Sequence, residues 1–440
     1  MSTEDNLDGS NFSERAHHLI PGGSHTYSRG DDQLPANAPA GFDRGKGARV
    51  WAVDGKQYVD WGMGINNVLI GHAEDIIDDA SISAIRRGQA FSRPTPLEVE
   101  LAAEIIALFP SMEMAKFCKS GSDANTAAVR LARAITGRDL VAYDAAAPFL
   151  SIHDWFIGKT EVNAGVPHAV RQLSVAFTYS DIESVRTLFQ EHPGKIAAVV
   201  MEVCRDVRPA PDFLEEVRRL CDENGTLLVF DEVVTAFRYG INGAYSLFGV
   251  TPDLISLGKG MGNGYSVSAL VGKRQFMERG GITHRKERVF FLSTTNGPEQ
   301  SALAAGLATI RFYQEHDVIA HLYEAGQALI EGINDVANRH GIAGFVLAAG
   351  DFSCRPMLLF RGSDEKPSLE FRTLFLQEMM ERQVFIPWVC PSFRHGQSEL
   401  AQTLEAADGA CAVYSRALEK GSVGGFLKGP VVKPVFRKFN

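Results

Sequence analysis

Residues 227–231 read Leu-Leu-Val-Phe-Asp, and residues 254–259 read Leu-Ile-Ser-Leu-Gly-Lys. Each stretch is a short, continuous apolar run that leads into an ionisable residue, Asp231 in the first and Lys259 in the second. Continuous apolar runs of this length are typical of strands that are buried on both faces in a parallel sheet. The sequence therefore predicts an α/β fold built around these two strands.

The segments around these strands alternate between helical and extended patterns from about residue 95 to residue 315. A further apolar strand, 196–201, ends at Glu202. Helical periodicity is predicted at 98–108, 124–135, 212–223 and 301–315. Because strands that alternate with helices form a mostly parallel sheet covered by helices, we expect a large α/β domain over residues 66–320.

The pattern changes after residue 320, where a smaller α+β domain is expected over 321–440. Its predicted elements are a long helix at 317–340, a strand at 356–360, a helix at 368–382, a strand at 384–386 and a helix at 397–419. Near the start of the chain, Asp54-Gly55 separates two alternating apolar segments, which is a strong hairpin signal. We expect residues 1–65 to pack with the smaller domain.

The composition excludes several classes of protein. The chain has 440 residues, too many for one core, and a net charge of -9 with no basic block, which argues against nucleic acid as a partner. Residues 1–10 are polar and acidic, so we expect no secretory signal, and no window is apolar enough for a membrane helix. The six cysteines form no CxxC pair and the twelve histidines no HxxxH pair, so we expect reduced thiols, no metal site and a cytoplasmic protein.

Ligands of open α/β sheets bind at the carboxyl ends of the strands, where Glu202, Asp231 and Lys259 are predicted to lie. A buried carboxylate and a buried amine are costly unless a partner occupies them. Pyridoxal phosphate (PLP) would occupy both, because its aldehyde forms a Schiff base with lysine and its ring nitrogen pairs with aspartate. Val233 would reach the same side as Asp231 and pack on a ring face. The alternative is that each ionisable residue is only the first polar residue of a loop.

Lys259 lies in a glycine-rich segment, 258–264. A phosphate-binding loop needs Ser or Thr directly after the lysine, where Gly260 stands, and a dinucleotide fingerprint needs glycine in place of Asn263. A Schiff-base lysine fits better, because small neighbours let the amine move between the cofactor and proton transfer. A surface lysine in a glycine-rich loop is the alternative.

The phosphate of PLP needs a helix N-terminus, and Ser120-Gly121-Ser122-Asp123 directly precedes the helix predicted at 124–135. Gly121 permits close approach, the Ser122 hydroxyl can donate, and the free N–H groups and helix dipole complement a dianion. The alternative is a simple Ser or Asp N-cap without a ligand.

In this order the motifs resemble the class III, fold-type I PLP-dependent aminotransferases, the group that includes glutamate-1-semialdehyde aminomutase. The resemblance spans about residues 15–415. It rests on the segments 20–23, 51–55, 58–60, 71–72, 120–124, 130–133, 136–138, 231–238 and the one around Lys259. It implies the PLP fold type I, with Lys259 as the Schiff-base lysine, Asp231 as the partner of the ring nitrogen, and Gly121 and Ser122 as phosphate ligands.

The resemblance also implies roles for residues outside these motifs. Thr294 resembles the threonine that reaches the phosphate from the neighbouring subunit, which implies a homodimer with shared active sites. Glu202 matches the family's strand-end glutamate, which supports the residues around the cofactor. Arg29 falls where the mutase has a carboxylate-binding arginine, and the alternative is a solvated loop residue.

Two segments depart from the family pattern. Asp123 stands where the family usually has glutamate. The family's aromatic-His-Gly motif, whose ring stacks on PLP, is represented by Phe149-Leu150-Ser151, which lacks the histidine and the glycine. Phe149 could still stack on the cofactor, because stacking needs only the ring.

The resemblance implies an enzyme that moves an amino group between a small-molecule amino donor and a carbonyl acceptor. Because of the altered segments 149–151 and 119–124, we favour an intermolecular aminotransferase that acts on a sugar or on a secondary-metabolite ketone or keto acid. A 2,1-aminomutase, which returns the amino group within one substrate, stays open. A non-catalytic PLP-binding regulator would need an added effector or DNA-binding module, and no segment of that size is spare.

Overall fold

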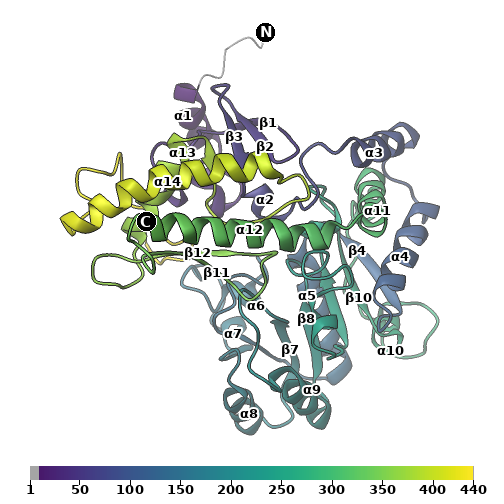
Figure 1. Ribbon diagram of the computed structural model, residues 1–440. Helices are drawn as coiled ribbons and strands as arrows, with labels where there is room; N and C mark the ends of the chain where they lie inside the picture. The colour runs from purple at the N-terminus through teal and green to yellow at the C-terminus, as the bar shows by residue number, and fades with distance from the viewer. Residues whose placement is uncertain (1–8, 440) are drawn as a thin grey trace. The chain divides into compact units, whose positions relative to one another are not determined.

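The computed structural model describes residues 9–439, which fall into two compact units (Figure 1). Of the described residues, one unit contains 9–74 together with Ala320–Arg437, and the other contains Asp75–Ile319 together with 438–439. Residues 1–8, on which the expectation of no secretory signal largely rests, lie outside the described part of the chain. The assignment of functional domains at 1–65, 66–320 and 321–440 stays a prediction.

A seven-stranded sheet forms the centre of the unit 75–319. Its strand order is β4-β10-β9-β8-β7-β5-β6. β10 runs antiparallel to both of its neighbours, and the other neighbouring pairs are parallel. The strands are β4 (Met114–Cys118), β5 (Leu140–Asp144), β6 (Ser174–Phe177), β7 (Ile196–Glu202), β8 (Leu227–Asp231), β9 (Leu254–Leu257) and β10 (Ser268–Gly272). The sheet confirms the predicted α/β fold, and β7, β8 and β9 are fully buried as their continuous apolar runs predicted.

Helix α5 (Gly121–Thr136) packs on one face of this sheet. Its alanine-rich stripe contacts alternate residues of the strands, including Val200 and Val229, because small side chains let helix and sheet approach closely. The helix begins at Gly121 rather than at 124, since the Ser120 hydroxyl accepts the Asp123 N–H (3.2 Å) and acts as the N-cap. The remaining helices of eight or more residues in this unit are α3 (Asp75–Arg87), α4 (Pro96–Leu108), α8 (Ile182–Glu191), α9 (Phe213–Asn224) and α11 (Gln300–Glu315).

The unit around the chain ends contains a four-stranded sheet in the order β1-β2-β3-β13 and a two-stranded ladder, β11 with β12. The predicted Asp-Gly hairpin is present as β2 (Arg49–Ala52) and β3 (Gln57–Asp60), and Gly55 adopts φ +84° in the turn, where glycine is favoured. β3 pairs in parallel with β13 (Val384–Phe385), which joins the N-terminal segment to residues from the end of the chain. The other strands are β1 (Phe42–Lys46), β11 (Val346–Ala349) and β12 (Met357–Phe360).

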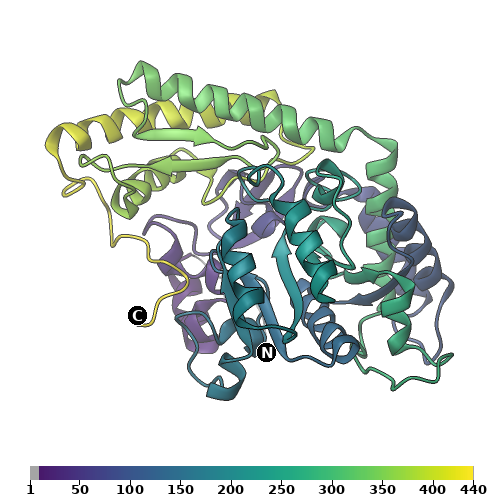
Figure 2. The same cartoon turned by 90° about the horizontal axis from the view of Figure 1, so that it is seen from below.

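Two long helices of this unit run side by side, α12 (Val318–Arg339) and α14 (Gln397–Lys420), as Figure 1 and Figure 2 both show. Together with α13 (Leu369–Glu381) they enclose a core of aliphatic and aromatic side chains. The helices predicted at 317–340, 368–382 and 397–419 are thus confirmed. None of the helices in the described part of the chain is long and apolar enough to cross a membrane.

Candidate active site

Three neighbouring strands place polar side chains in one row at their carboxyl ends. In the parallel ladder Glu202 pairs with Asp231, and Asp231 pairs with Ser256. Side chains at paired positions of neighbouring strands point to the same face of a sheet. α5 covers this same face, because Asn125 of that helix donates a hydrogen bond to Asp231 Oδ2. Val229 and Leu254, two residues before Asp231 and Ser256, belong to the same hydrophobic cluster as the alanines of α5.

The Asp231 carboxylate is buried and held by two donors. Asp231 is only 5% exposed. Oδ1 accepts the Val233 N–H (2.9 Å), and Oδ2 accepts a hydrogen bond from Asn125 Nδ2 (2.7 Å). Burial raises the pKa of Asp231 to about 6, and the two donors and the charge of Lys259 oppose this shift. A buried acid of this kind is suited to a positively charged or N–H partner.

Lys259 follows β9 directly and starts a single 3-10 turn, Lys259–Met261. Its φ of +44° lies in a region that residues other than glycine rarely adopt, and such strain is concentrated at functional sites. The residue is partly buried, and its charge acts on Asp231. The two residues singled out from the sequence therefore lie close enough for the charge of Lys259 to favour the ionised form of Asp231.

The Val233 side chain lies close to two glycines. Gly121 belongs to the segment expected to bind phosphate, and Gly258 directly precedes Lys259. A Cβ at Gly121 would lie 2.5 Å from Val233 Cγ2, and a Cβ at Gly258 would lie 3.3 Å from Val233 Cγ1 and 2.7 Å from Ser268 Oγ. Only glycine fits at Gly121 without a shift of its neighbours. The N-terminus of α5, the end of β8 and the lysine loop thus meet at Val233.

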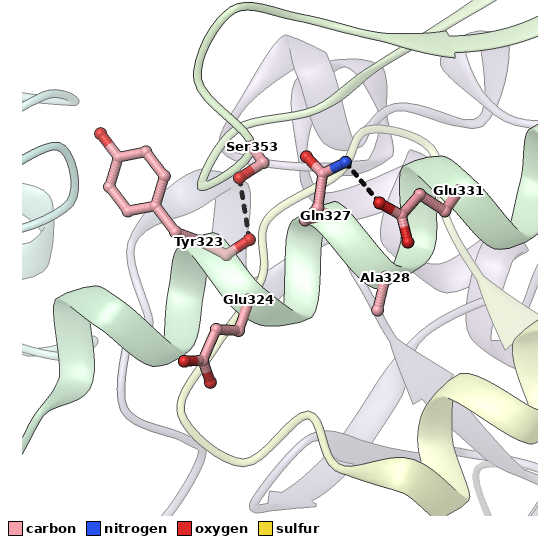
Figure 3. A pocket seen from close by; sticks show the side chains of 6 residues that line it. All are labelled: Tyr323, Glu324, Gln327, Ala328, Glu331 and Ser353. Atoms are coloured by element: carbon pink, nitrogen blue, oxygen red, sulfur yellow. Dashed lines mark hydrogen bonds between the residues drawn. The ribbon is translucent and has the colours of Figure 1, made fainter.

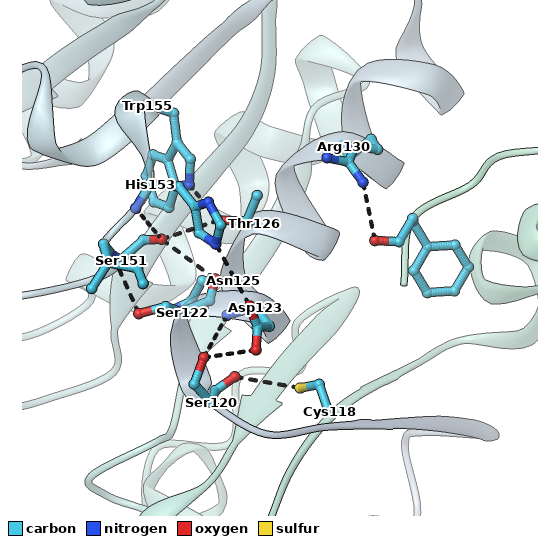
Figure 4. A network of polar contacts seen from close by, with 12 residues as sticks. Cys118, Ser120, Ser122, Asp123, Asn125, Thr126, Arg130, Ser151, His153 and Trp155 are labelled. Carbon is cyan, nitrogen blue, oxygen red and sulfur yellow. Dashed lines mark hydrogen bonds and ion pairs between the residues drawn. The ribbon is translucent and has the colours of Figure 1, made fainter. Parts of the chain in front are cut away.

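Residues 149–155 dock on the first turns of α5 (Figure 4). Ser122 Oγ accepts the Ile152 N–H (3.2 Å), and Ser151 Oγ lies 3.0 Å from Thr126 Oγ1. Trp155 Nε1 donates to Thr126 Oγ1 as well (2.9 Å). These contacts fix the segment that carries Phe149 against the proposed phosphate-binding helix.

Phe149 is 45% exposed, and its ring meets Phe156 edge-on with 6.0 Å between the centroids. The next residue, Leu150, is buried, and its carbonyl accepts a hydrogen bond from Asn125 Nδ2 (2.7 Å). The backbone of Leu150 is therefore linked through Asn125 to Asp231, while the neighbouring Phe149 side chain stays partly exposed.

Glu202 is buried at the end of β7 and faces a cation that sequence reasoning missed. Arg205 Nη2 lies 2.7 Å from Asp144 Oδ2, and Arg205 Nε lies 3.9 Å from Glu202 Oε2. Arg205 thus stands between the acidic ends of β5 and β7 and offsets their charge. Its position three residues after Glu202 was the only signal in the sequence.

Thr294 and Arg29, which were expected at the site, are not linked to it by the contacts described. Thr294 is exposed in a turn in which the Gly297 N–H donates to the Thr294 carbonyl (3.1 Å). Arg29 is exposed at the end of a short 3-10 turn, Tyr27–Arg29, and belongs to the other unit.

Asn125 and Ser256 were also not identified from the sequence. Their polar atoms indicate whether the site has room for a ligand's polar group. Asn125 Oδ1 and Ser256 Oγ are buried and have no hydrogen-bond partner among residues 9–439. Unpaired buried polar atoms are uncommon in proteins and call for an explanation. Both belong to residues in contact with, or paired in the sheet with, Asp231, so the surroundings of this acid have capacity left for a polar group. Asn125 could have been noticed as a polar residue on the alanine-rich buried stripe of its helix.

A separate, shallow hollow lies on α12 in the other unit (Figure 3). Within it Gln327 Nε2 donates to Glu331 Oε1 (2.8 Å), and Ser353 Oγ donates to the Tyr323 carbonyl (2.8 Å). None of the site residues expected from the sequence lines this hollow. Among the residues that the structure describes, no group of three or more His, Cys, Asp or Glu side chains is arranged to hold a metal ion.

The architecture is that of the PLP-dependent transaminases. FumI of Sphingopyxis sp. MTA144, solved in its PLP internal aldimine form, is 28% identical to this chain with a TM-score of 0.86, and the match covers 94% of this chain and 98% of FumI. An omega-transaminase from Sphaerobacter thermophilus is 26% identical with a TM-score of 0.83, over 94% of this chain and 99% of that one.

Sequence comparison gives the family. Residues 28–354 match the class-III aminotransferases. The chain is 32% identical over 405 residues to the 3-aminobutyryl-CoA aminotransferase of Cloacimonas acidaminovorans, which covers 89% of this chain and 94% of that protein. It is also 32% identical over 415 residues to a glutamate-1-semialdehyde 2,1-aminomutase of Desulfitobacterium hafniense. This match covers 89% of this chain and 95% of that protein.

The chain belongs to the class-III aminotransferase family. It is a PLP-dependent enzyme that acts on small molecules, which confirms the resemblance, the fold, the enzyme class and the cofactor inferred from the sequence.

Proposed function

We propose that this enzyme is an intermolecular aminotransferase in which Lys259 holds PLP and Asp231 faces the ring nitrogen. The observation that carries the proposal is the Asp231 carboxylate, which is buried, fixed by Val233 and Asn125, and influenced by the charge of Lys259. A buried, ionised carboxylate without a partner destabilises the fold. A protonated ring nitrogen of PLP would be such a partner for Asp231.

When bound, PLP supplies an electrophilic aldehyde and a ring that accepts the electron pair released from the substrate. The Lys259 amine would act as the base that takes the proton from the substrate carbon bearing the amino group and as the acid that returns it during the transfer. Asp231 would keep the ring nitrogen protonated. The N–H groups at the start of α5, at Gly121 and Ser122, would bind the phosphate.

The remaining residues would shape and complete the site. Val233 and Phe149 would contact the two faces of the ring, and Glu202, balanced by Arg205, would support the strand ends. Thr294 would reach the phosphate of the partner subunit's site, so the active form would be a homodimer with shared active sites. Its exposure in the single chain supports this role.

Two features of the proposal concern substrate and location. Arg29 would bind a substrate carboxylate, which its exposed position permits. The protein would be cytoplasmic, which is supported by six cysteines that are all buried and that form no disulfide in the described part of the chain.

We favour transfer between two molecules over an aminomutase reaction. The relatives named 3-aminobutyryl-CoA aminotransferase and omega-transaminase support transfer, and the altered 149–151 segment favours a ketone, keto acid or sugar acceptor. The equal identity to glutamate-1-semialdehyde 2,1-aminomutases keeps intramolecular transfer as the second candidate.

The decisive experiment follows the nitrogen atom. The PLP-loaded enzyme is screened with ¹⁵N-labelled amino donors, including β-amino acids, and its aminated form is then screened with ketones, keto acids and keto sugars. We expect the product amine to carry the label of a second molecule. A product whose amine comes from within a single substrate would instead establish the mutase reaction.

The assignment of the lysine is tested by absorbance. Lys259→Ala should lose the absorbance of lysine-bound PLP, whereas Lys273→Ala, at a lysine that pairs with Asp253 (2.8 Å), should keep it. Retention of that absorbance in Lys259→Ala would show that another lysine holds the cofactor.

A further inference from the structure

The side-chain amide of Asn125 joins two parts of the proposed cofactor site that are far apart in the sequence. Asn125 is 1% exposed and lies in the second turn of α5. Its Nδ2 group donates to Asp231 Oδ2 (2.7 Å) and to the Leu150 carbonyl (2.7 Å). Both protons of one NH₂ group are therefore used, one on the acid and one on the segment that carries Phe149.

The orientation of this amide is fixed by chemistry. With the amide turned over, Asn125 Oδ1 would face a carboxylate oxygen and a carbonyl oxygen, and no proton would lie between them. In the orientation observed, Oδ1 is buried without a partner among the described residues. The protein thus leaves one acceptor unpaired and gives both donors to Asp231 and Leu150.

A neutral donor is the appropriate neighbour for an acid that must keep its charge. Lysine or arginine at this position would form an ion pair with Asp231 and offset its charge, and a second carboxylate would favour the protonated, uncharged form of the acid. The two hydrogen bonds to Asp231, from Asn125 and from the Val233 N–H, fix the carboxylate plane and leave its charge available to a further partner.

We propose that Asn125 is a positioning residue, which acts through Asp231 to set the contact with the PLP ring nitrogen and ties the Phe149 segment to the same point. This inference rests on the proposed role of Asp231. In a purely structural role, Asn125 would stabilise the packing of α5 on the sheet and would have no specific effect on the contact between Asp231 and the ring nitrogen.

The test compares the binding of PLP with that of 1-deaza-pyridoxal phosphate, in which a C–H group replaces the ring nitrogen. Both compounds react with the lysine, so the ratio of their dissociation constants isolates the contact of Asp231 with the ring nitrogen. We expect Asn125→Ala to reduce the preference for PLP roughly tenfold, because a hydrogen bond to a charged group is lost. An equal weakening of both compounds would overturn the proposal.

Thr126→Val is the matched control. Thr126 lies next to Asn125 and also holds the 151–155 segment, through Ser151 (3.0 Å) and Trp155 (2.9 Å), but it has no described contact with Asp231 (Figure 4). We expect it to leave the preference for PLP unchanged. A loss of preference equal to that of Asn125→Ala would show that segment docking, rather than contact with Asp231, is responsible, and would overturn the proposal.

Asp231→Ala separates this inference from the proposed function. If Asp231→Ala abolishes the preference and Asn125→Ala does not change it, only the role of Asn125 is wrong. If Asp231→Ala keeps the full preference, the role of Asp231 is wrong and that of Asn125 falls with it. Should Asn125→Ala fail to fold, Asn125→Ser keeps one short donor and is expected to give a smaller loss of preference by the same measurement.

Discussion

The Asp231 carboxylate opposes the stability of the protein before the cofactor is bound. Burial raises the pKa of Asp231 from 3.8 to about 6. Between these values the folded protein holds a proton that the unfolded chain has lost, so the free energy of unfolding falls as pH rises from about 4 to 6. This cost in stability supports the proposed role of Asp231 at the cofactor.

We predict that Asp231→Asn removes this dependence in the cofactor-free protein. Relative to wild type, its free energy of unfolding should rise by roughly 3 kcal/mol between pH 4 and pH 7. The measurement is chemical denaturation across this range, with Asp43→Asn, at an exposed strand position, as control. An identical pH profile for wild type and Asp231→Asn would contradict the buried charge.

His395 gives the opposite dependence on pH in the other unit. Its Nδ1 accepts hydrogen bonds from the Ser392 N–H (3.0 Å) and hydroxyl (2.8 Å), and its ring stacks on Trp61 at 3.9 Å between centroids. Burial lowers the pKa of His395 from 6.5 to about 4. As pH falls from 6.5 to about 4, His395 binds a proton in the unfolded chain but stays neutral in the folded protein. The free energy of unfolding therefore decreases.

The prediction is a loss of about 3 kcal/mol of stability between pH 6.5 and pH 4 that disappears in His395→Asn. Asparagine offers an acceptor near the position of Nδ1 and cannot be protonated there. His18→Asn, at an exposed position, serves as the control and should keep the wild-type profile. If His395→Asn also keeps it, another group is the acid-sensitive one.

At the scale of elements, the N-terminus of α5 depends on a glycine that the sequence marked for phosphate binding. We predict that Gly121→Ala lowers the free energy of unfolding by about 1–3 kcal/mol, because the new methyl group would overlap Val233, which lies 2.5 Å from its position. Val233→Ala in the same chain should restore most of the loss.

Gly306→Ala in α11 is the matched control for this helix substitution. The added methyl group would lie 3.4 Å or more from its neighbours, an ordinary contact, and we expect a gain of about 0.5–1 kcal/mol. Thermal and chemical denaturation of the three variants measure both effects. If Val233→Ala gives no recovery, the overlap is not the cause of the loss at Gly121.

The helical pattern of α5 was predicted from the spacing of its alanines, but its first residue was not. Periodicity depends on which face is buried, and it fades at the helix ends, where a side-chain cap decides the boundary. The Ser120 hydroxyl makes this cap, so the helix includes Gly121 and Ser122 in its first turn. This placement leaves their N–H groups without a partner within the helix, as the proposed phosphate-binding role requires.

At the scale of the whole molecule, the proposed sharing of sites between subunits can be tested by complementation. Lys259→Ala and Thr294→Ala chains carry different tags and are co-expressed, so that mixed dimers form. If Thr294 serves the partner subunit, each mixed dimer has one intact site, and a random mixture regains about a quarter of the wild-type sites. Turnover of the mixture, compared with the two parent variants, is the measurement.

A mixture no more active than the average of its parents would show that Lys259 and Thr294 of the same chain form one site. Separate purification of the doubly tagged dimers provides the control, because it confirms that mixed dimers were present.

The sequence by itself determined the class of fold and the cofactor, and it singled out Asp231 and Lys259, whose roles at the cofactor stay a prediction. These follow from local patterns, since an apolar run must be buried and a charge at its end must face a partner or solvent. The tertiary structure alone decided which side chains surround Asp231 and the loop of Lys259. Asn125 reaches Asp231 across 106 positions of the chain, and Val233 lies between Gly121 and Gly258, because strand order and helix packing join residues that share no local pattern.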